Sequence, residues 1–281
     1  MSKYVNINGA IIEISEANIS SANRSFKYGD GCFETMKINS GKVFLKELHM
    51  KRLFGSLKQL QYKIPSHFNT FFIKENIKAL AEANELFTGR IRLTISRGNG
   101  NLHDLDDLKL NFVIGQSPVE KSFNQLNTDG LQIGIYKNAI KPADSFSAIK
   151  STNFLCYVMG AVWAHQLKIN DAIILNQDGR LADTTIANVF IIKNGFIKTP
   201  AITEGCIAGV MRQYLLNKFR QDDLPVEEGK ISIDDILNAS EVFLTNAIRG
   251  IQWVKQVEQS CFTNDLTKKL HQKYITSLFN S

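Results

Sequence analysis

Residues 171–198 read DAIILNQDGRLADTTIANVFIIKNGFIK, and this stretch decides the class of the fold. The apolar runs at 171–176 and 188–192 have the length and the β-branched content of buried strands. Gln177-Asp178-Gly179-Arg180 and Asn194-Gly195 follow these runs and are turn sequences of the kind that join antiparallel strands. The stretch therefore predicts a strand-rich unit in the second half of the chain.

The same reasoning extends outward in both directions. In the second half we expect further strands at 131–136, 196–198 and 241–245, and helices at 154–166, 209–219, 231–238 and 265–278. In the first half, Asn8-Gly9 predicts a hairpin over 4–14. Hydrophobic spacing there predicts strands at 32–38, 42–45, 90–96 and 109–114, and helices at 47–60 and 68–83. The first half is thus expected to be an α+β unit.

A change of composition separates the two halves. Residues 115–130 are rich in Ser, Asn, Gln and Pro and show little periodicity. We therefore expect a small α+β domain over 1–115, a linker over 116–130 and a larger domain over 131–281. A cofactor site, if the chain has one, is expected in the cleft between two such domains.

Composition and charge exclude several classes of protein. The 281 residues are 44% hydrophobic and 21% charged, which is typical of a globular chain. The net charge of +6 is dispersed and forms no arginine-rich stripe, which argues against a nucleic-acid-binding protein. No apolar run is long enough to span a membrane, and the first residues lack the apolar core of a signal peptide. We expect a cytoplasmic protein.

The cysteines and histidines give no sign of a metal site. Cys32, Cys156, Cys206 and Cys261 are widely spaced, without a CxxC pair or a histidine at metal-ligand spacing. The sequence also lacks the common phosphate-loop, dinucleotide and hydrolase motifs. We expect reduced thiols and no metal.

Four segments carry residues suited to chemistry. Lys150 stands between an extended stretch and an apolar helix, where burial or a nearby cation can free a lysine amine for Schiff-base formation; the alternative is a solvated lysine. Asp183 and a run of small hydroxyl residues precede a buried strand. Residues 205–212 form a glycine-bracketed turn into a helix whose first amides can hold a phosphate. Residues 244–250 form a small polar turn after a strand.

Together with 28–35 and 49–53, these segments resemble the fold-type IV pyridoxal-phosphate enzymes, the class IV aminotransferase family. That family holds branched-chain and D-amino-acid aminotransferases and aminodeoxychorismate lyase. The resemblance covers nearly the whole chain: a lysine with asparagine three residues later, a carboxylate five residues ahead of Asn-Val-Phe, and a glycine-aliphatic-x-Arg turn occur in the family's order. It implies an α+β fold of two domains, a small α/β N-terminal domain and a larger β-barrel-like C-terminal domain.

The resemblance implies pyridoxal 5'-phosphate as the cofactor and assigns residues to it. Lys150 matches the lysine that forms the Schiff base, and Arg52 matches the arginine on the phosphate. Asp183 matches the carboxylate that keeps the pyridine nitrogen protonated, although the family commonly has glutamate there. The rest of the phosphate site would consist of the amides of Val210 and Met211 with Thr245, Asn246 and Ala247.

The substrate is less well defined by the resemblance. The loop after Arg97 has Asn101 and Leu102 where lyases and D-amino-acid aminotransferases place a second arginine, so Arg249 or His103 could supply the missing charge. Arg97 itself is either part of the clamp or a surface residue, and Phe33 is a candidate for the side-chain pocket.

Three functions stay open. We favour transfer of an amino group between an amino acid and a 2-oxo acid, with the branched-chain amino acids among the candidate substrates. Release of pyruvate and 4-aminobenzoate by an aminodeoxychorismate lyase is the alternative. A non-enzymatic member of the family is the third. The resemblance also implies a homodimer.

Overall fold

The computed structural model describes residues 2–104 and 109–279. The chain divides into two compact units, one made of Met1–Glu120 with Lys150–Phe154 and the other of Lys121–Ile149 with Leu155–Ser281. The chain thus enters the second unit after Glu120, returns to the first for the five residues Lys150–Phe154, and then continues in the second. The expected division into consecutive segments, 1–115, 116–130 and 131–281, does not include the return of residues 150–154 to the first unit.

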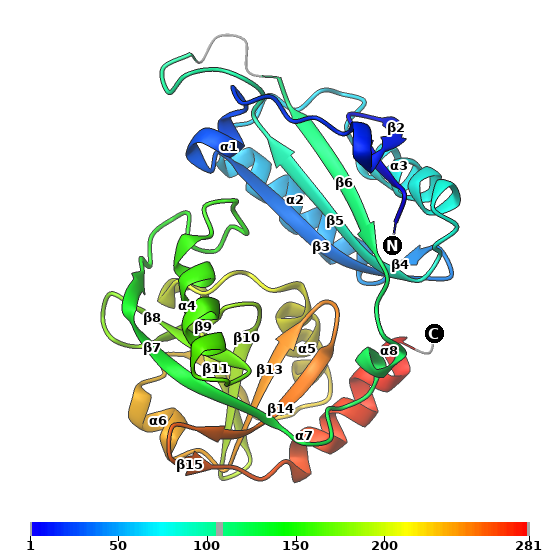
Figure 1. The fold of residues 1–281 in the computed structure, drawn as a ribbon. Coiled ribbons are helices and arrows are strands. Elements are labelled where there is room, and N and C mark those ends of the chain that lie inside the picture. The colour runs from blue at the N-terminus through cyan, green and yellow to red at the C-terminus, as the bar shows by residue number, and fades with distance from the viewer. Residues whose placement is uncertain (1, 105–108, 280–281) are drawn as a thin grey trace. The chain divides into compact units, whose positions relative to one another are not determined.

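The first unit is built on a six-stranded antiparallel sheet (Figure 1). Its strands, in the order in which they pair, are β2 (Ala10–Glu13), β1 (Tyr4–Ile7), β6 (Asn111–Ser117), β5 (Gly89–Ser96), β3 (Gly31–Asn39) and β4 (Lys42–Val43). Its helices are α1 (Arg24–Tyr28), α2 (Lys46–Gln59) and α3 (Thr70–Ala83). The predicted hairpin around Asn8-Gly9 is β1–β2, with Ile7 opposite Ala10. The connection between β5 and β6 includes residues 105–108, which lie outside the described residues.

The two long helices cover one face of this sheet. Asn6, Ile114, Leu93 and Glu34 lie opposite one another across four neighbouring strands, so their side chains share a face. On that face Glu34 bonds to α2 and Asn6 bonds to Asn76 of α3. Phe33 and its cross-strand neighbours therefore belong to the opposite face, because successive side chains of a strand alternate.

The second unit is built on a nine-stranded mixed sheet. Its paired order is β12 (Val226–Gly229), β11 (Phe196–Pro200), β10 (Asn188–Lys193), β13 (Glu241–Asn246), β14 (Gly250–Val257), β7 (Leu131–Lys141), β8 (Asp171–Asn176) and β9 (Leu181–Thr184), with β15 (Ser260–Cys261) pairing with β14. Its α-helices are α4 (Leu155–Gln166), α5 (Val210–Gln221), α6 (Ile233–Leu237), α7 (Asp265–Leu270) and α8 (Ser277–Phe279).

This sheet curls back on itself. β9 ends the paired path, yet it also contacts β10 and β11 from the other end of that path. The Thr184 N–H donates to the Ala187 carbonyl at 2.8 Å, which turns the chain from β9 into β10. The aliphatic side chains enclosed by the curl, among them Ile173, Leu181 and Val254, are almost fully buried. The expected barrel-like sheet is therefore present.

Helix α4 is apolar over most of its length. It contains no Asp, Glu, Lys or Arg, and Gly160 lets it lie close to β8, since a Cβ there would come within 2.9 Å of the Ile174 side chain. Its other face leaves Leu155, Val158 and Met159 exposed. No helix in the described ranges 2–104 and 109–279 is long and apolar enough to cross a membrane.

The structure corrects several predicted elements. The turn predicted at 244–250 leads into β14, a mostly buried strand in the middle of the sheet that the sequence analysis did not predict. The strand predicted at 131–136 continues to Lys141 after a change of register, because Ile140 pairs with Leu175. The predicted C-terminal helix contains a π-helical segment over His271–Thr276.

Candidate functional site

Lys150 lies on the sheet face of the first unit that the helices leave uncovered. Its carbonyl accepts a hydrogen bond from the Phe33 N–H at 2.9 Å, and Ser151 and Cys32 form a β-bridge. The Lys150 ammonium lies 4.6 Å from the centre of the Phe33 ring and 5.4 Å from that of Phe154. The predicted reactive lysine is thus half-buried against two aromatic rings, rather than solvated.

Arg92 shares the Phe33 ring with Lys150. Its guanidinium carbon lies 3.7 Å from the ring centre, and Arg92 pairs with Thr35 in the ladder between β5 and β3. Its side chain is exposed, and its guanidinium forms no hydrogen bond or ion pair with the residues that the structure describes. Arg92 was not predicted from the sequence as a site residue. The alternation of 90–96 was the available signal, because it places Arg92 on the face opposite Ile91 and Leu93.

Arg52 lies on α2 and forms a bidentate ion pair with a buried carboxylate. Its Nε and Nη2 donate to the two oxygens of Glu34 at 2.7 and 2.6 Å, and His49 Nδ1 lies 2.6 Å from Glu34 Oε2. Burial acts to raise the pKa of Glu34, but the charge of Arg52 and the hydrogen bonds from His49 and Arg52 outweigh it and lower that pKa to about 2. Glu34 therefore fixes the orientation of Arg52, the residue predicted to bind the cofactor phosphate.

Asp183 lies at the centre of a buried cluster in the second unit. Its Oδ2 accepts hydrogen bonds from Lys141 Nζ at 3.2 Å, the Tyr157 hydroxyl at 3.0 Å and the Ile207 N–H at 2.9 Å. Its Oδ1 is buried and has no hydrogen-bond partner among the residues described. A buried acceptor without a donor is costly, so this oxygen is suited to a donor from a bound molecule.

The turn predicted to hold a phosphate is positioned by Asn188. The Asn188 side-chain amide donates to the Ile207 carbonyl at 2.8 Å, and a Cβ on Gly209 would overlap the Asn188 side-chain oxygen. Gly209 is the N-cap of α5 and offers no side chain to its first amides, which include those of Val210 and Met211. These amides are therefore available to an anion, which the helix dipole also favours.

Thr245 places the predicted turn at 244–250 beside Asn188. It lies opposite Asn188 in the ladder between β13 and β10, and its hydroxyl is buried without a hydrogen-bond partner in the described part of the chain. The side-chain oxygen of Asn246 accepts from the N–H groups of Ile248 and Arg249 at 3.0 and 2.9 Å and so closes the turn around Ala247. Asp183, the start of α5 and Thr245 are thus linked through Asn188 and Ile207.

The residues predicted for the substrate differ in their surroundings. Arg97 is not a plain surface residue, since it bonds to Asp30 Oδ1 at 3.2 Å and to the Leu60 carbonyl, and it lies over the Tyr62 ring. The Arg249 guanidinium lies 4.1 Å from the centre of the Phe123 ring, in the second unit. His103 is exposed and belongs to no helix or strand.

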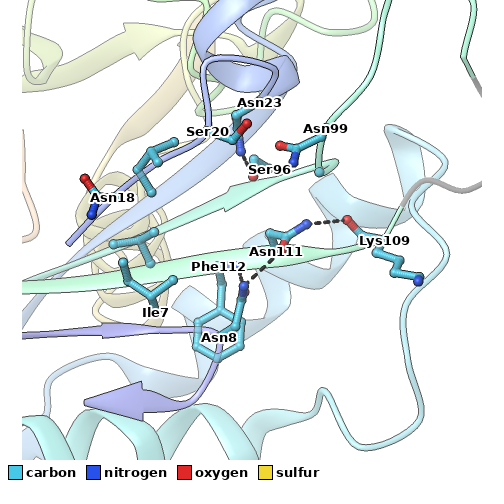
Figure 2. Close-up of a pocket in the computed structure, with 13 residues that line it drawn as sticks. Ile7, Asn8, Asn18, Ser20, Asn23, Ser96, Asn99, Lys109, Asn111 and Phe112 are labelled. Carbon is cyan, nitrogen blue, oxygen red and sulfur yellow. Dashed lines mark hydrogen bonds between the residues drawn. The ribbon is translucent and has the colours of Figure 1, made fainter. Parts of the chain in front are cut away.

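A polar pocket of about 420 Å³ lies elsewhere on the first unit, between the β1–β2 turn and the facing ends of β5 and β6 (Figure 2). Its amide side chains bond largely to one another and to the backbone: Asn8 donates to Asn111, Asn111 to the Lys109 carbonyl, and Asn23 to Ser96. Its lining includes none of the predicted site residues, all of which are described. These bonds brace loops, so we assign the pocket no ligand.

The described residues, 2–104 and 109–279, contain neither a cluster of metal-ligating side chains nor a disulfide. No group of three or more His, Cys, Asp or Glu side chains there could hold a metal ion. All four cysteines are unpaired, and burial raises the pKa of Cys206 to about 11 and that of Cys32 to about 12. These two thiols stay protonated at neutral pH and are poor nucleophiles.

The second unit thus holds a buried carboxylate and a helix N-terminus suited to an anion, and the first unit holds a lysine packed against two aromatic rings. The sequence pattern of the amino-transferase class IV family matches residues 31–257, so the chain belongs to that family. The resemblance drawn from the sequence and the expected fold class are both confirmed, and the chain is an enzyme of this family.

Three known proteins illustrate the relationship. A Methanocaldococcus jannaschii protein named "Putative branched-chain-amino-acid aminotransferase" is 28% identical over 95% of this chain and 94% of its own. The aminodeoxychorismate lyase of Bacillus subtilis is 29% identical over 90% of this chain and 86% of its own. The structure of the branched-chain amino acid aminotransferase from Thermobaculum terrenum in its PLP-form superposes with a TM-score of 0.86 at 20% identity, covering 99% of this chain and 94% of that one.

Proposed function

We propose that the protein is a pyridoxal-phosphate-dependent aminotransferase that moves an amino group between an amino acid and a 2-oxo acid. The observation that carries the proposal is the buried Asp183 carboxylate, whose Oδ1 has no hydrogen-bond donor in the described part of the chain. Such an oxygen would accept a hydrogen bond from a protonated ring nitrogen. The solved PLP-form of the Thermobaculum terrenum aminotransferase supports the choice of cofactor.

The residues of the second unit fit this cofactor at both ends. Asp183 would hold the proton on the ring nitrogen, and the unpaired Thr245 hydroxyl with the first amides of α5 would bind the phosphate. From the first unit we assign Lys150 to the covalent bond with the cofactor and Arg52 to the phosphate, as the family resemblance implies. When bound, the cofactor supplies an electron sink that stabilises negative charge at the substrate α-carbon.

Lys150 and Arg92 divide the work on the substrate in this proposal. Lys150, once its amine is free, takes the proton from the substrate α-carbon. Arg92 binds the substrate carboxylate, because its exposed guanidinium lies over the same Phe33 ring as the Lys150 ammonium. Arg92 thus takes the place in the substrate clamp that the sequence analysis sought in Arg249 or His103.

Lyase chemistry is the second candidate. It is favoured by the 29% identity to the aminodeoxychorismate lyase of Bacillus subtilis. Both reactions begin with loss of the same proton, so residues around the cofactor do not separate them. The lyase must in addition bind the carboxylate of a bulky ring, and Leu102, which is exposed, offers no charge for that purpose.

A half-reaction screen tests the proposal. The purified enzyme is loaded with pyridoxal phosphate and mixed with single L- and D-amino acids, and conversion of the cofactor to its amine form is followed by absorbance. We expect conversion by at least one amino acid. No conversion by any amino acid, together with release of pyruvate and 4-aminobenzoate from aminodeoxychorismate, would establish the lyase instead.

Two further measurements test the cofactor and the assembly. Borohydride reduction followed by peptide mapping is expected to place the cofactor on Lys150. A chain that binds no cofactor on titration would contradict the proposed cofactor. We also propose a homodimer, as the family resemblance implies, and light scattering at micromolar concentration would contradict it by giving the mass of one 31.6 kDa chain.

A further inference from the structure

The cluster around Asp183 contains two residues that the proposed chemistry does not yet use. Lys141 stands at the end of β7 with its side chain 7% exposed, and its ammonium lies 3.2 Å from Asp183 Oδ2. The same ammonium lies 5.1 Å from the centre of the Tyr157 ring. Tyr157, from α4, donates a hydrogen bond from its hydroxyl to the same oxygen of Asp183. A buried lysine is costly unless it is paired, so this position serves the carboxylate.

The three donors all meet one oxygen. Lys141, Tyr157 and the Ile207 N–H contact Oδ2 within 3.2 Å, and Oδ1 is left as the only unbonded oxygen of the group. A carboxylate turns about a single bond, so without such a bias either oxygen could accept these donors. The arrangement therefore fixes which oxygen faces a ligand.

We propose that Lys141 and Tyr157 are positioning residues that turn Asp183 so that its Oδ1 is presented to the ring nitrogen of the cofactor. This inference rests on the proposed function. It also explains how aspartate can stand where the family commonly has glutamate: the shorter side chain is held from behind by a cation and a phenol.

The other titratable groups beside Asp183 are neutral. Burial, and next the charge of Asp183, raise the pKa of Tyr157 well above its ordinary value, so Tyr157 remains a donor. Burial also raises the pKa of the Cys156 and Cys206 thiols, which interact electrostatically with Asp183. Lys141 is therefore the cation that balances the carboxylate within this cluster.

The test compares the affinity for pyridoxal phosphate with that for its 1-deaza analogue, in which the ring nitrogen is replaced by CH. The ratio measured is the dissociation constant of the 1-deaza analogue divided by that of pyridoxal phosphate. A large ratio reports a favourable contact to the ring nitrogen. We expect Lys141→Met to reduce the ratio by about tenfold or more, the effect of losing one charge-assisted hydrogen bond. Tyr157→Phe should reduce it less, and Lys141→Arg should restore part of it.

Matched controls separate positioning from stability. Lys137→Met removes an exposed lysine from the same strand and should leave the ratio unchanged. A purely structural role of Lys141 would weaken the binding of both cofactors equally, so an unchanged ratio in Lys141→Met would overturn the proposal. If Lys141→Met does not fold by circular dichroism, Tyr157→Phe decides in its place, and an unchanged ratio there overturns the proposal.

The same experiment distinguishes this inference from the proposed function. Asp183→Asn should lower the ratio if Asp183 contacts the ring nitrogen. If the ratio falls in Asp183→Asn but keeps its wild-type value in Lys141→Met, only the positioning role of Lys141 is rejected. A wild-type chain that binds neither compound would reject the proposed function and the inference with it.

Discussion

Glu34 is a charged residue in the interior of the first unit, and its charge depends on two partners. The side chain is 2% exposed and bonds to Arg52 and His49. Its pKa of about 2 in the folded chain lies below the ordinary value of 4.5, so folding favours its charged form. The stability that this contributes is fully present above pH 4.5 and is lost as the pH falls towards 2.

Protonation of Glu34 is expected to contribute to acid unfolding. In wild type, the free energy of unfolding from urea titrations should fall between pH 4.5 and 2, and Glu34 should account for on the order of 3 kcal/mol of that loss. Glu34→Gln should be less stable at pH 7 and should lose less on acidification. Parallel curves for the two proteins would show that Glu34 is not the group responsible.

Arg92 leads to a prediction about substrate binding. Arg92→Leu should raise the KM for both the amino acid and the 2-oxo acid by about tenfold or more, because a carboxylate loses a charge-assisted partner. Cofactor affinity should not change. Arg90→Leu is the control, since Arg90 is exposed on the same strand and its Nε bonds to Ser117. Equal KM values in wild type and Arg92→Leu would remove Arg92 from the clamp.

The sequence was informative for residues that belong to a motif. Asp183 and Thr245 stand in short runs whose order along the chain carries the family resemblance, and the structure shows both with an unpaired buried oxygen. Arg92 and Lys141 stand in no such run. Their surroundings depend on which strands pair and in which register, and this information is absent from the local sequence.

At the level of elements, the start of α5 is a turn with no space for a side chain at Gly209. Gly209 has φ −63°, so its backbone would accept any residue, and only the lack of space beside Asn188 requires glycine. Gly209→Ala should lower stability by about 1 to 3 kcal/mol, the range for overpacking. It should also weaken cofactor binding, because Asn188 holds the turn through Ile207.

Gly115→Ala is the matched control for this prediction. Gly115 stands in β6 and a Cβ there meets nothing within 4 Å, so the melting temperature and the cofactor affinity should stay close to wild type. The measurement is thermal unfolding by circular dichroism with and without pyridoxal phosphate. If Gly209→Ala melts like Gly115→Ala and binds the cofactor normally, the turn is less constrained than the contact with Asn188 implies.

Most elements could be predicted from spacing, and the missed strand shows the limit. The strand at 171–176 has the predicted bounds, and α2 differs from the predicted 47–60 by one residue at each end. β14 was missed because a register shift between Val254 and Gln256 breaks the two-residue alternation of its apolar side chains. Both Val254 and Val257 are fully buried as a result.

At the scale of the whole molecule, the path of the chain couples the two units. Lys150–Phe154 belongs to the first unit, but it is continuous on either side with residues of the second. Within the first unit its backbone bonds to Phe33 and Gly31. If the second unit unfolds, this segment is connected on both sides to disordered chain. The conformational entropy of that chain opposes the position of the segment beside β3.

We therefore expect the units to unfold together. Hydrogen exchange measured by mass spectrometry in increasing urea should give the same free energy of opening for the slowest amides of β5 and of β10. These strands are central in the first and the second sheet. A lower value for one of them would mean that its unit opens while the other stays folded, and that the segment does not couple them.

The return of Lys150–Phe154 to the first unit also has a consequence for the gene. Recombination that joins the first 120 codons of one relative to the remainder of another would leave the Phe33 N–H facing a foreign lysine segment. To keep the side-chain contacts of Phe33 with Lys150 and Phe154 within one parent, a chimera would have to carry codons 150–154 from the same parent as codons 1–120, which takes two further crossovers. We therefore expect exchange between relatives at residue 120 to be rare.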